Sequence, residues 1–387
     1  MNKRETSDTV LQIALDNAVA RIAGNRQLFG AAFPDDATEH GHYHARRYAG
    51  LPDGENTGWT SGFWTGMLWM AYEYSNDDAL RIAALAHLPG YQRRLAEHID
   101  INHHDMGFLY TPSCVAANRI CDDANAKHLA LAAADTLMQR YLPTAGIIQA
   151  WGDLDDPAQC GRMIIDCLLN LPLLHWAGQV SGSAHYREAA ISHLQNSRNF
   201  LVRNDSSSFH TFHFDPKSGA PLYGSSHQGA AADSCWARGQ AWGIYGFAIN
   251  HRYVPELGLL DVAIRQADYF LARLPANGIA YWDLIYGDGS GEPWDSSASA
   301  IAICGLLEIA ELVPSESLAQ HYRAEAQRIC LSLIQSCSGE LQEGNALLLH
   351  GVYSKPEERS VDEGNLWGDY FYLEALLRLT NNWNRYW

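Results

Sequence analysis

Two kinds of helical segment alternate along this chain, and the alternation restricts the folds that the sequence can adopt. Segments of the first kind are amphipathic, with apolar residues three and four positions apart. In 183–203, for example, Tyr186, Ala190, Leu194 and Leu201 form one stripe. The same pattern occurs at 7–27, 78–97, 123–141, 257–274 and 316–337.

Segments of the second kind are apolar on nearly all sides and open with Gly, Ser, Trp or Asp. Such a helix must be covered by protein on every side. We expect Pro172 to kink the helix it interrupts, because proline breaks the hydrogen bonds of a helix interior. These apolar segments are 59–74, 105–118, 161–177, 237–253, 294–313 and 366–380, of which 105–118 has the weakest pattern.

Six segments of each kind in alternation predict an all-α fold, in which six inner helices are ringed by six outer ones. This is the (α/α)6 barrel, with the whole chain, 1–387, as a single domain. A flat bundle would leave one face of some apolar helices exposed to solvent. Strand signals are weak, although H-T-F-H-F-D at 210–215 and the following K-S-G-A-P-L-Y-G suit a short hairpin. Loops that enter the inner helices should gather at one end and carry the functional site.

Composition excludes several classes of function. The formal net charge of −17 disfavours binding to nucleic acid or to an anionic membrane surface. No apolar run reaches membrane-spanning length, and no secretion signal is evident at the N-terminus. The eight cysteines form no close-set group, and three pairs lie seven residues apart, too far for a disulfide within one helix. We therefore expect free thiols and a cytoplasmic protein.

Two aspartates lie beside or among apolar residues, Asp105 in N-H-H-D-M-G-F and Asp166 in G-R-M-I-I-D-C-L-L-N. A carboxyl group deprived of water has a raised pKa and can donate a proton near neutral pH. Two carboxyls in unlike surroundings suit general acid–base chemistry on sugars. For Asp166 a functional role outweighs helix bracing, whereas Asp105 by itself fits either interpretation.

Polar and aromatic residues are concentrated at 225–243. If a helix begins near Trp236, then Arg238 and Trp242 share one face, and the guanidinium can hold a carboxylate. Flat aromatic rings beside small polar residues suit sugars, although core packing is the favoured explanation for any single tryptophan. The candidates for a sugar pocket are His227, Gln228, Trp236, Arg238 and Trp242 in this segment, with Trp59, Trp151 and His210 elsewhere.

Metal and cofactor signals are weak. His103, His104 and Asp105 are adjacent and converge poorly, and the alternating histidines at 40, 42 and 44 form at best a weak metal site. Phosphate-binding loops and the G-x-S-x-G nucleophile elbow do not occur in the sequence. The residues by themselves therefore do not favour a metal site.

Taken together and in order, these motifs resemble the bacterial unsaturated glucuronyl hydrolases of glycoside hydrolase family 88. The similarity extends over nearly the whole chain. The matching segments are W-T-S-G-F-W-T-G (59–66), H-H-D-M-G-F-L-Y (103–110), G-I-I-Q-A-W-G (146–152), R-M-I-I-D-C-L-L-N-L-P-L-L (162–174), H-T-F-H-F-D (210–215), H-Q-G (227–229), W-A-R-G-Q-A-W-G-I-Y-G-F (236–247), D-S-S-A-S-A (295–300) and W-G-D-Y-F-Y-L-E-A-L (367–376).

The resemblance implies an (α/α)6 barrel without a cofactor, acting on lyase-generated oligosaccharides that end in a 4,5-unsaturated uronic acid. Such an enzyme protonates C4 of the vinyl ether and adds water at C5, after which the glycosidic bond falls apart. It implies Asp166 as the general acid/base, with Asp105 positioning the ring and His104 supporting Asp105. The implied pocket residues are Trp59, Trp151, His210, Gln228, Trp236, Arg238 and Trp242.

One stretch departs from the family pattern. Members that act on sulfated glycosaminoglycan fragments carry a segment with serines and a lysine that recognises the sulfate group. Here S-K-P-E-E-R at 354–359 keeps Ser354 and has Arg359 in place of the lysine, but Glu357 replaces the second serine. Because a carboxylate repels sulfate, we predict a preference for unsulfated or weakly sulfated fragments. Lys355 and Arg359 would offset part of the repulsion.

Alternatives remain at this point. The unsaturated rhamnogalacturonyl hydrolases of family 105 share the architecture, and so do sugar epimerases of the N-acetylglucosamine 2-epimerase type. An inverting glycosidase on saturated chains and a non-catalytic sugar-binding protein are further possibilities. The partner is expected to be a small sugar, with the protein as a monomer or homodimer.

Overall fold

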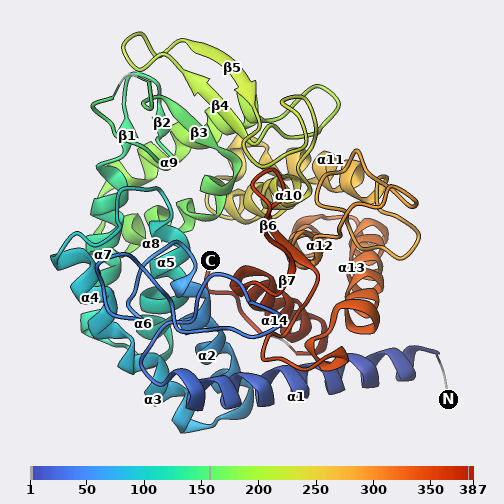
Figure 1. The fold of residues 1–387 in the computed structure, drawn as a ribbon. Coiled ribbons are helices and arrows are strands. Elements are labelled where there is room, and N and C mark those ends of the chain that lie inside the picture. Colours follow the sequence, from blue (N-terminus) through green and yellow to red (C-terminus); the bar gives the residue numbers. More distant parts are fainter. Residues whose placement is uncertain (1–2, 157, 382) are drawn as a thin grey trace.

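The computed structural model describes residues 3–156, 158–381 and 383–387, and within them the helices form a closed double ring (Figure 1). Each inner helix packs against the next, and α14 closes the ring against α2. This confirms the predicted (α/α)6 architecture. The inner helices are α2 (Ser61–Ser75), α5 (Met106–Tyr110) continued by η1 (Thr111–Val115) and α6 (Ala116–Cys121), α8 (Leu171–Ser181), α10 (Ala237–His251), α12 (Ser296–Leu312) and α14 (Leu366–Thr380).

The outer helices match the amphipathic segments, with one break. Segment 78–97 forms two helices instead of one, because Pro89 lies in the first turn of the second and disfavours helix in the residue before it. The outer elements are α1 (Lys3–Phe29), α3 (Asp78–Ala86) with α4 (Leu88–Ala96), α7 (Ala124–Met138), α9 (Ala184–Asn196) with η3 (Ser197–Leu201), α11 (Leu259–Leu271) and α13 (Glu316–Cys337).

The prediction of one helix over 161–177 is wrong in its first half. The segment begins as strand β3 (Arg162–Ile164), which is followed by the 3₁₀ helix η2 (Ile165–Leu169). Hydrogen bonds to β4 (Thr211–Phe214) hold β3 extended, and β4 pairs with β5 (Pro221–Ser225) in the predicted hairpin. The kink expected at Pro172 is also absent. Proline there lies in the first turn of α8, where its missing N–H has no helical partner to lose.

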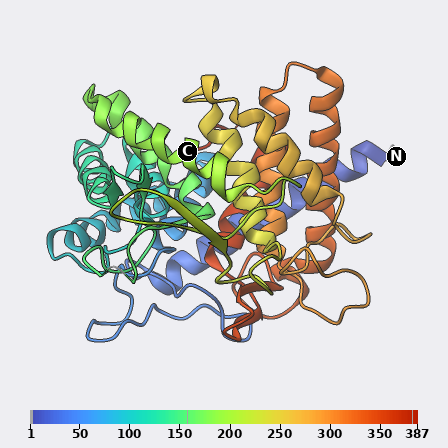
Figure 2. The ribbon, with the colours of Figure 1, turned by 90° about the horizontal axis from the view of Figure 1, so that it is seen from above.

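Segments that enter the inner helices gather at one end of the ring, as predicted. In Figure 2, the long segment between α1 and α2 lies at the same end as the β6–β7 hairpin. Two small antiparallel sheets stiffen these connections: β1 (Tyr141–Leu142) with β2 (Ile147–Ile148), and β6 (Gly351–Ser354) with β7 (Arg359–Glu363). Short 3₁₀ turns lie at η4 (Pro255–Leu257) and η5 (Gly339–Leu341).

The centre of the ring is filled by side chains, so the barrel is not a channel. Near the chain's end, Trp387 is buried inside the ring and stacks on Phe371 of α14, with 6.0 Å between ring centroids. All eight cysteines are free, as predicted, and six of them are buried. No helix in the described ranges is both long and apolar enough to cross a bilayer.

Candidate active site

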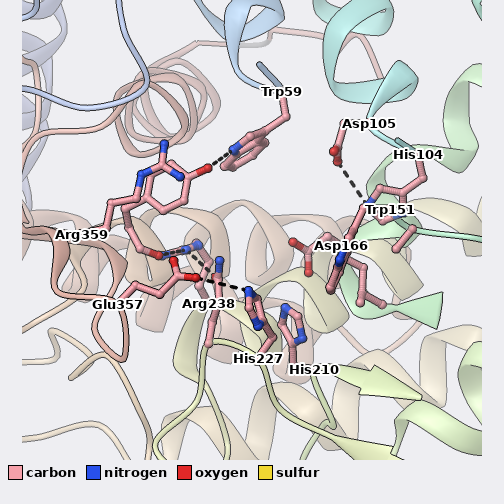
Figure 3. A pocket seen from close by; sticks show the side chains of 14 residues that line it. Trp59, His104, Asp105, Trp151, Asp166, His210, His227, Arg238, Glu357 and Arg359 are labelled. Carbon is pink, nitrogen blue, oxygen red and sulfur yellow. Dashed lines mark hydrogen bonds and ion pairs between the residues drawn. The ribbon is translucent and has the colours of Figure 1, made fainter. Parts of the chain in front are cut away.

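A cavity of about 320 Å³ opens at the loop-bearing end of the ring (Figure 3). Its volume lies at the lower end of the range for small-molecule sites. The walls come from segments that precede four of the inner helices (α2, α5, α8 and α10), from the first turn of α10, and from the β6–β7 hairpin that precedes α14. The lining residues are Trp59, His104, Asp105, Ala150, Trp151, Ile164, Asp166, His210, His227, Gln228, Arg238, Tyr353, Glu357 and Arg359.

Asp166 projects into this cavity from the first turn of η2. Burial raises the pKa of its carboxyl group to about 7, and the nearby Asp105 carboxylate adds to the rise, against the lowering effect of His104 and Arg238. Its Oδ1 is buried and has no hydrogen-bond partner in the protein. A carboxyl group in this position holds a proton near neutral pH and has an oxygen free for a ligand.

Asp105 lies immediately before α5 and has the opposite character. Burial disfavours its charge, but His104 and His103 outweigh burial and hold its pKa well below the ordinary range. The Nε2 of His104 lies 3.3 Å from Oδ1, and burial alone would lower the pKa of this imidazole, but Asp105 raises it to about 10. The two aspartates are therefore differently protonated at neutral pH.

His103 is held in place by contacts at both of its ring nitrogens. Its Nδ1 accepts the backbone N–H of Asp105 at 3.1 Å, and its Nε2 lies 2.9 Å from the carbonyl oxygen of Asp100. Nδ1 also lies 3.1 Å from Asp105 Oδ2, and Nε2 lies 3.1 Å from Nη2 of the Arg94 guanidinium. Both histidines therefore contact the Asp105 carboxylate, His104 through its Nε2.

Aromatic rings form two walls of the cavity. Trp59 stacks at a tilt on Trp367, 4.9 Å between centroids, and its Nε1–H donates to the Tyr353 hydroxyl at 2.8 Å. Trp151 forms the opposite wall, with the Arg162 guanidinium over its ring. His210 lies on the Trp151 side of the cavity, with 6.2 Å between the two ring centroids, and burial lowers the pKa of its ring to about 3, so it stays neutral.

Arg238 lines the cavity, but the expected free guanidinium fork is absent. Its Nη1 pairs with the Asp295 carboxylate at 2.8 Å, and its Nη2 donates to the Tyr353 carbonyl at 2.7 Å. Nη2 also donates to Gln228 Oε1 at 3.0 Å, which orients the Gln228 NH₂ group away from the arginine. The sequence could not reveal this, because Asp295 and the 352–353 carbonyls lie far along the chain.

Three predicted pocket residues do not line the cavity. Trp242 is fully buried and packs on Phe108, because α10 turns this face toward the ring's core. Trp236 lies behind the wall, under the Arg238 guanidinium and edge-on to His210. Ser354 is buried on β6, with its hydroxyl unpaired, because alternation along the strand turns Tyr353 to the cavity instead.

The mouth of the cavity carries three charged or titratable side chains. Glu357, in the β6–β7 turn, lies 3.6 Å from the Nε2 of His227. Arg359, at the start of β7, lies over the Tyr353 ring and 3.3 Å from Asp36. The sequence did not point to Tyr353, and His227 was a pocket candidate that the family resemblance did not include. The alternation of G-V-Y-S before the last inner helix was the available signal for Tyr353.

No three His, Cys, Asp or Glu side chains in the described ranges converge as metal ligands. An α/α barrel with one neutral and one ionised carboxyl group in an aromatic-walled pocket defines the class of the protein: a carbohydrate-active enzyme.

Comparison with known proteins narrows the class to a family. The family model "Glycosyl Hydrolase Family 88" matches residues 32–382. An unsaturated chondroitin disaccharide hydrolase of Streptococcus pyogenes serotype M1 is 46% identical, over 97% of this chain and 92% of the relative. An unsaturated glucuronyl hydrolase of Bacillus sp. (strain GL1) is 44% identical, over 97% and 98%.

Comparison with solved structures leads to the same family. The crystal structure of an unsaturated glucuronyl hydrolase from Streptococcus agalactiae superposes with a TM-score of 0.93 at 44% identity, covering 98% of this chain and 94% of that one. The chain belongs to glycoside hydrolase family 88 and is a glycoside hydrolase, which confirms the family predicted from the sequence motifs.

Proposed function

We propose that this enzyme removes a 4,5-unsaturated uronic acid from the non-reducing end of lyase-generated glycosaminoglycan-type disaccharides, by hydration of the C4=C5 vinyl ether. The names of the relatives support this substrate class. The observation that carries the proposal is the neutral Asp166 carboxyl group, with a pKa of about 7 and an unpaired oxygen in the cavity.

Asp166 performs both proton transfers. Its O–H gives a proton to C4, and the positive charge that develops at C5 is shared with the ring oxygen. The Asp166 carboxylate then takes a proton from water as the water oxygen bonds to C5, which restores the acid. The product is a hemiketal at C5, which opens to a ketone, and the glycosidic bond then breaks at C1 without further catalysis by a second carboxyl group.

Asp105 stays ionised throughout this cycle. Its low pKa makes it a permanent negative charge beside the ring on which positive charge develops. A fixed carboxylate in a partly buried site stabilises such charge without reorganisation. His104 holds the Asp105 carboxylate in place and offsets its charge when Asp166 is also ionised.

The uronate carboxylate is held by the Gln228 amide. Arg238 contributes only indirectly, by orienting Gln228. Its own four hydrogen bonds are donated to Asp295, Gln228 and two backbone carbonyls. With Oε1 taken by Arg238, the NH₂ of Gln228 is left to donate toward the sugar. The walls formed by Trp59 and Trp151 stack on the sugar rings.

The test is the loss of ultraviolet absorbance as the conjugated alkene of an unsaturated chondroitin disaccharide is hydrated. We expect the native enzyme to erase the band and Asp166→Asn to lower kcat by about 10⁴-fold or more, since the amide has no acidic proton. Binding of the disaccharide to Asp166→Asn, measured by calorimetry, should persist. An epimerase, an inverting glycosidase or a binding protein would leave the band intact, and turnover by Asp166→Asn would remove Asp166 as the acid.

Residues 1–387 act as a single catalytic domain in the cytoplasm, as a monomer or homodimer. All eight thiols are free, which suits a reducing compartment, and the substrate is a disaccharide small enough to be imported. Cell fractionation and light scattering of the purified protein test these two parts of the proposal.

A further inference from the structure

Residues 383–387 dock against the end of the ring that lies away from the cavity. The Tyr386 hydroxyl donates to Glu73 at 2.6 Å, and Arg385 pairs with Glu308 at 2.9 Å. The two glutamates lie near the C-terminal ends of α2 and α12, two of the inner helices. With these two anchors, the final side chain of the segment is directed into the centre of the ring (Figure 1).

Trp387, this final side chain, lies between α5 and α14 and is almost fully buried. Its ring stacks on Phe371 with 6.0 Å between centroids, and it meets Tyr370 and Phe108 edge-on at 5.8 and 6.2 Å. Its Nε1–H donates to the buried Glu374 carboxylate at 3.1 Å, which fixes the orientation of the indole. The helix α2 packs against both α5 and α14, so the indole joins two helices that flank α2 in the ring.

Phe108 connects this indole to the active site. It follows Asp105 by three residues in the sequence, and its ring meets Trp59, a wall of the cavity, with 5.7 Å between centroids. Phe63 provides a second link, at 5.3 Å from Phe108 and 5.9 Å from Trp59. The rings of Trp387, Phe108 and Trp59 therefore form a continuous aromatic column from the far end of the ring to the cavity.

The column lies in a closely packed interior, in which Phe63 and Phe108 are fully buried. Such an interior transmits displacements, because a side chain beside a new void relaxes partly into it. Phe108 is the neighbour of Trp387 whose displacement would reach both Trp59 and Asp105. Trp387 is not a lining residue of the cavity, so any effect on the reaction passes through its neighbours.

We propose that Trp387 is a positioning residue for the hydration reaction. From the end of the ring opposite to the cavity it holds Phe108 in place, and through Phe108 it holds the Trp59 wall and the Asp105 end of α5. The inference rests on the proposed function, because the reaction it concerns is the one proposed above.

The first experiment is Trp387→Ala, assayed with and without added indole. The substitution leaves a buried apolar void, and such voids bind small aromatic molecules. For the unsaturated chondroitin disaccharide we expect kcat to fall and KM to rise, each about tenfold, because displaced groups lose their productive geometry. Indole should restore both constants. A loss of folded protein alone would lower the apparent kcat and leave KM unchanged.

Trp69→Ala is the matched control. Trp69 is fully buried in α2, and among the described residues its ring meets Tyr72, at 6.4 Å, and no ring of the column. We expect this variant to be less stable than the native enzyme but to keep its kcat and KM. An unchanged KM in Trp387→Ala, or indole that restores neither constant, overturns the proposal.

The second experiment needs no substrate. In ¹⁵N-tryptophan-labelled protein, the indole N–H signal of Trp59 reports on its hydrogen bond to Tyr353, and its loss in Trp59→Phe assigns it. We expect this signal to shift in Trp387→Phe, a conservative variant that serves even if Trp387→Ala does not fold, and to stay in place in Trp69→Phe. A Trp59 signal that does not move in Trp387→Phe, or that moves equally in Trp69→Phe, overturns the proposal. A native enzyme that leaves the alkene band intact, while the Trp59 signal moves, overturns the proposed function and not this contact.

Discussion

At the scale of single residues, the site depends on two aspartates that the protein holds in opposite protonation states. Burial raises the pKa of Asp166, whereas the histidine partners of Asp105 lower its pKa in spite of burial. Both effects have one physical origin, the high cost of an unpaired charge away from water. Histidine partners stabilise the charge of Asp105, whereas Asp166 lacks such a partner.

The raised pKa of Asp166 predicts a pH dependence. A carboxyl group with a pKa of about 7 is protonated below pH 7 and loses its proton above it, so kcat/KM should fall tenfold per pH unit on the alkaline side. Asp369, a buried structural carboxyl group, also has a pKa of about 7. Unfolding must therefore be measured over the same pH range. An alkaline limb absent up to pH 9 contradicts the role of Asp166.

Glu357 predicts selectivity against sulfate. The carboxylate lies at the cavity mouth beside His227 and near Arg359, where it repels an anionic substituent. We expect faster turnover of an unsulfated than of a sulfated unsaturated chondroitin disaccharide, and Glu357→Ser should raise the sulfated-to-unsulfated ratio about tenfold, or about 1.4 kcal/mol. Glu358→Ser removes a neighbouring but well-exposed carboxylate and is the control. A native enzyme that clearly prefers the sulfated sugar defeats the prediction.

At the scale of elements, the positions of the two aspartates depend on the contact of α5 with Asn170, which lies between η2 and α8. A Cβ placed on Gly107 would lie 2.3 Å from the Asn170 Cα, so the two backbones approach as closely as glycine allows. The Asn170 side chain also accepts the Phe108 N–H at 2.7 Å. This contact joins the elements that carry Asp105 and Asp166.

Gly107→Ala should therefore affect both stability and catalysis. The added methyl group must push α5 from Asn170, with an expected loss of about 1–3 kcal/mol in the free energy of unfolding and a fall in kcat of about 10²-fold. Urea unfolding and the absorbance assay measure the two effects. Gly24→Ala in α1, where nothing lies within 4 Å, should instead stabilise by up to about 1 kcal/mol. Native-like kcat in Gly107→Ala would show that the contact does not position the aspartates.

At the scale of the whole molecule, the two ends of the ring have different tasks. Residues that line the cavity lie shortly before or at the start of α2, α5, α8 and α10, so the positive ends of these helix dipoles lie toward an anionic sugar. Together with screening over about 8 Å, this accounts for an anionic substrate in a protein of net charge −17. At the other end, buried ion pairs join the helices.

Arg378 of α14 is the centre of that second end. Its guanidinium contacts Glu308 of α12 at 3.0 Å and Glu374 at 3.4 Å, and both carboxylates are fully buried. Arg378→Met should cost about 3–5 kcal/mol in unfolding free energy, because it removes the ion-pair partner of the buried Glu374 carboxylate, with KM unchanged. Arg187→Met breaks an exposed pair with Glu256 and should cost less than about 1 kcal/mol. A small loss of unfolding free energy in Arg378→Met would mean that water or protonation of the glutamates already compensates the buried charge.

The sequence alone determined the ring, its helices and the chemical class of the site, because apolar periodicity and motifs are local along the chain. It failed where segments far apart in the sequence meet: pairing with β4 makes 162–164 a strand, and Asp295 and the β6 carbonyls bind the Arg238 guanidinium. It also failed to separate pocket from core, since Trp59 and Trp242 have similar neighbours in sequence but only Trp59 faces the cavity. Tertiary packing decides which side of a helix faces solvent or a cavity and which charges are paired.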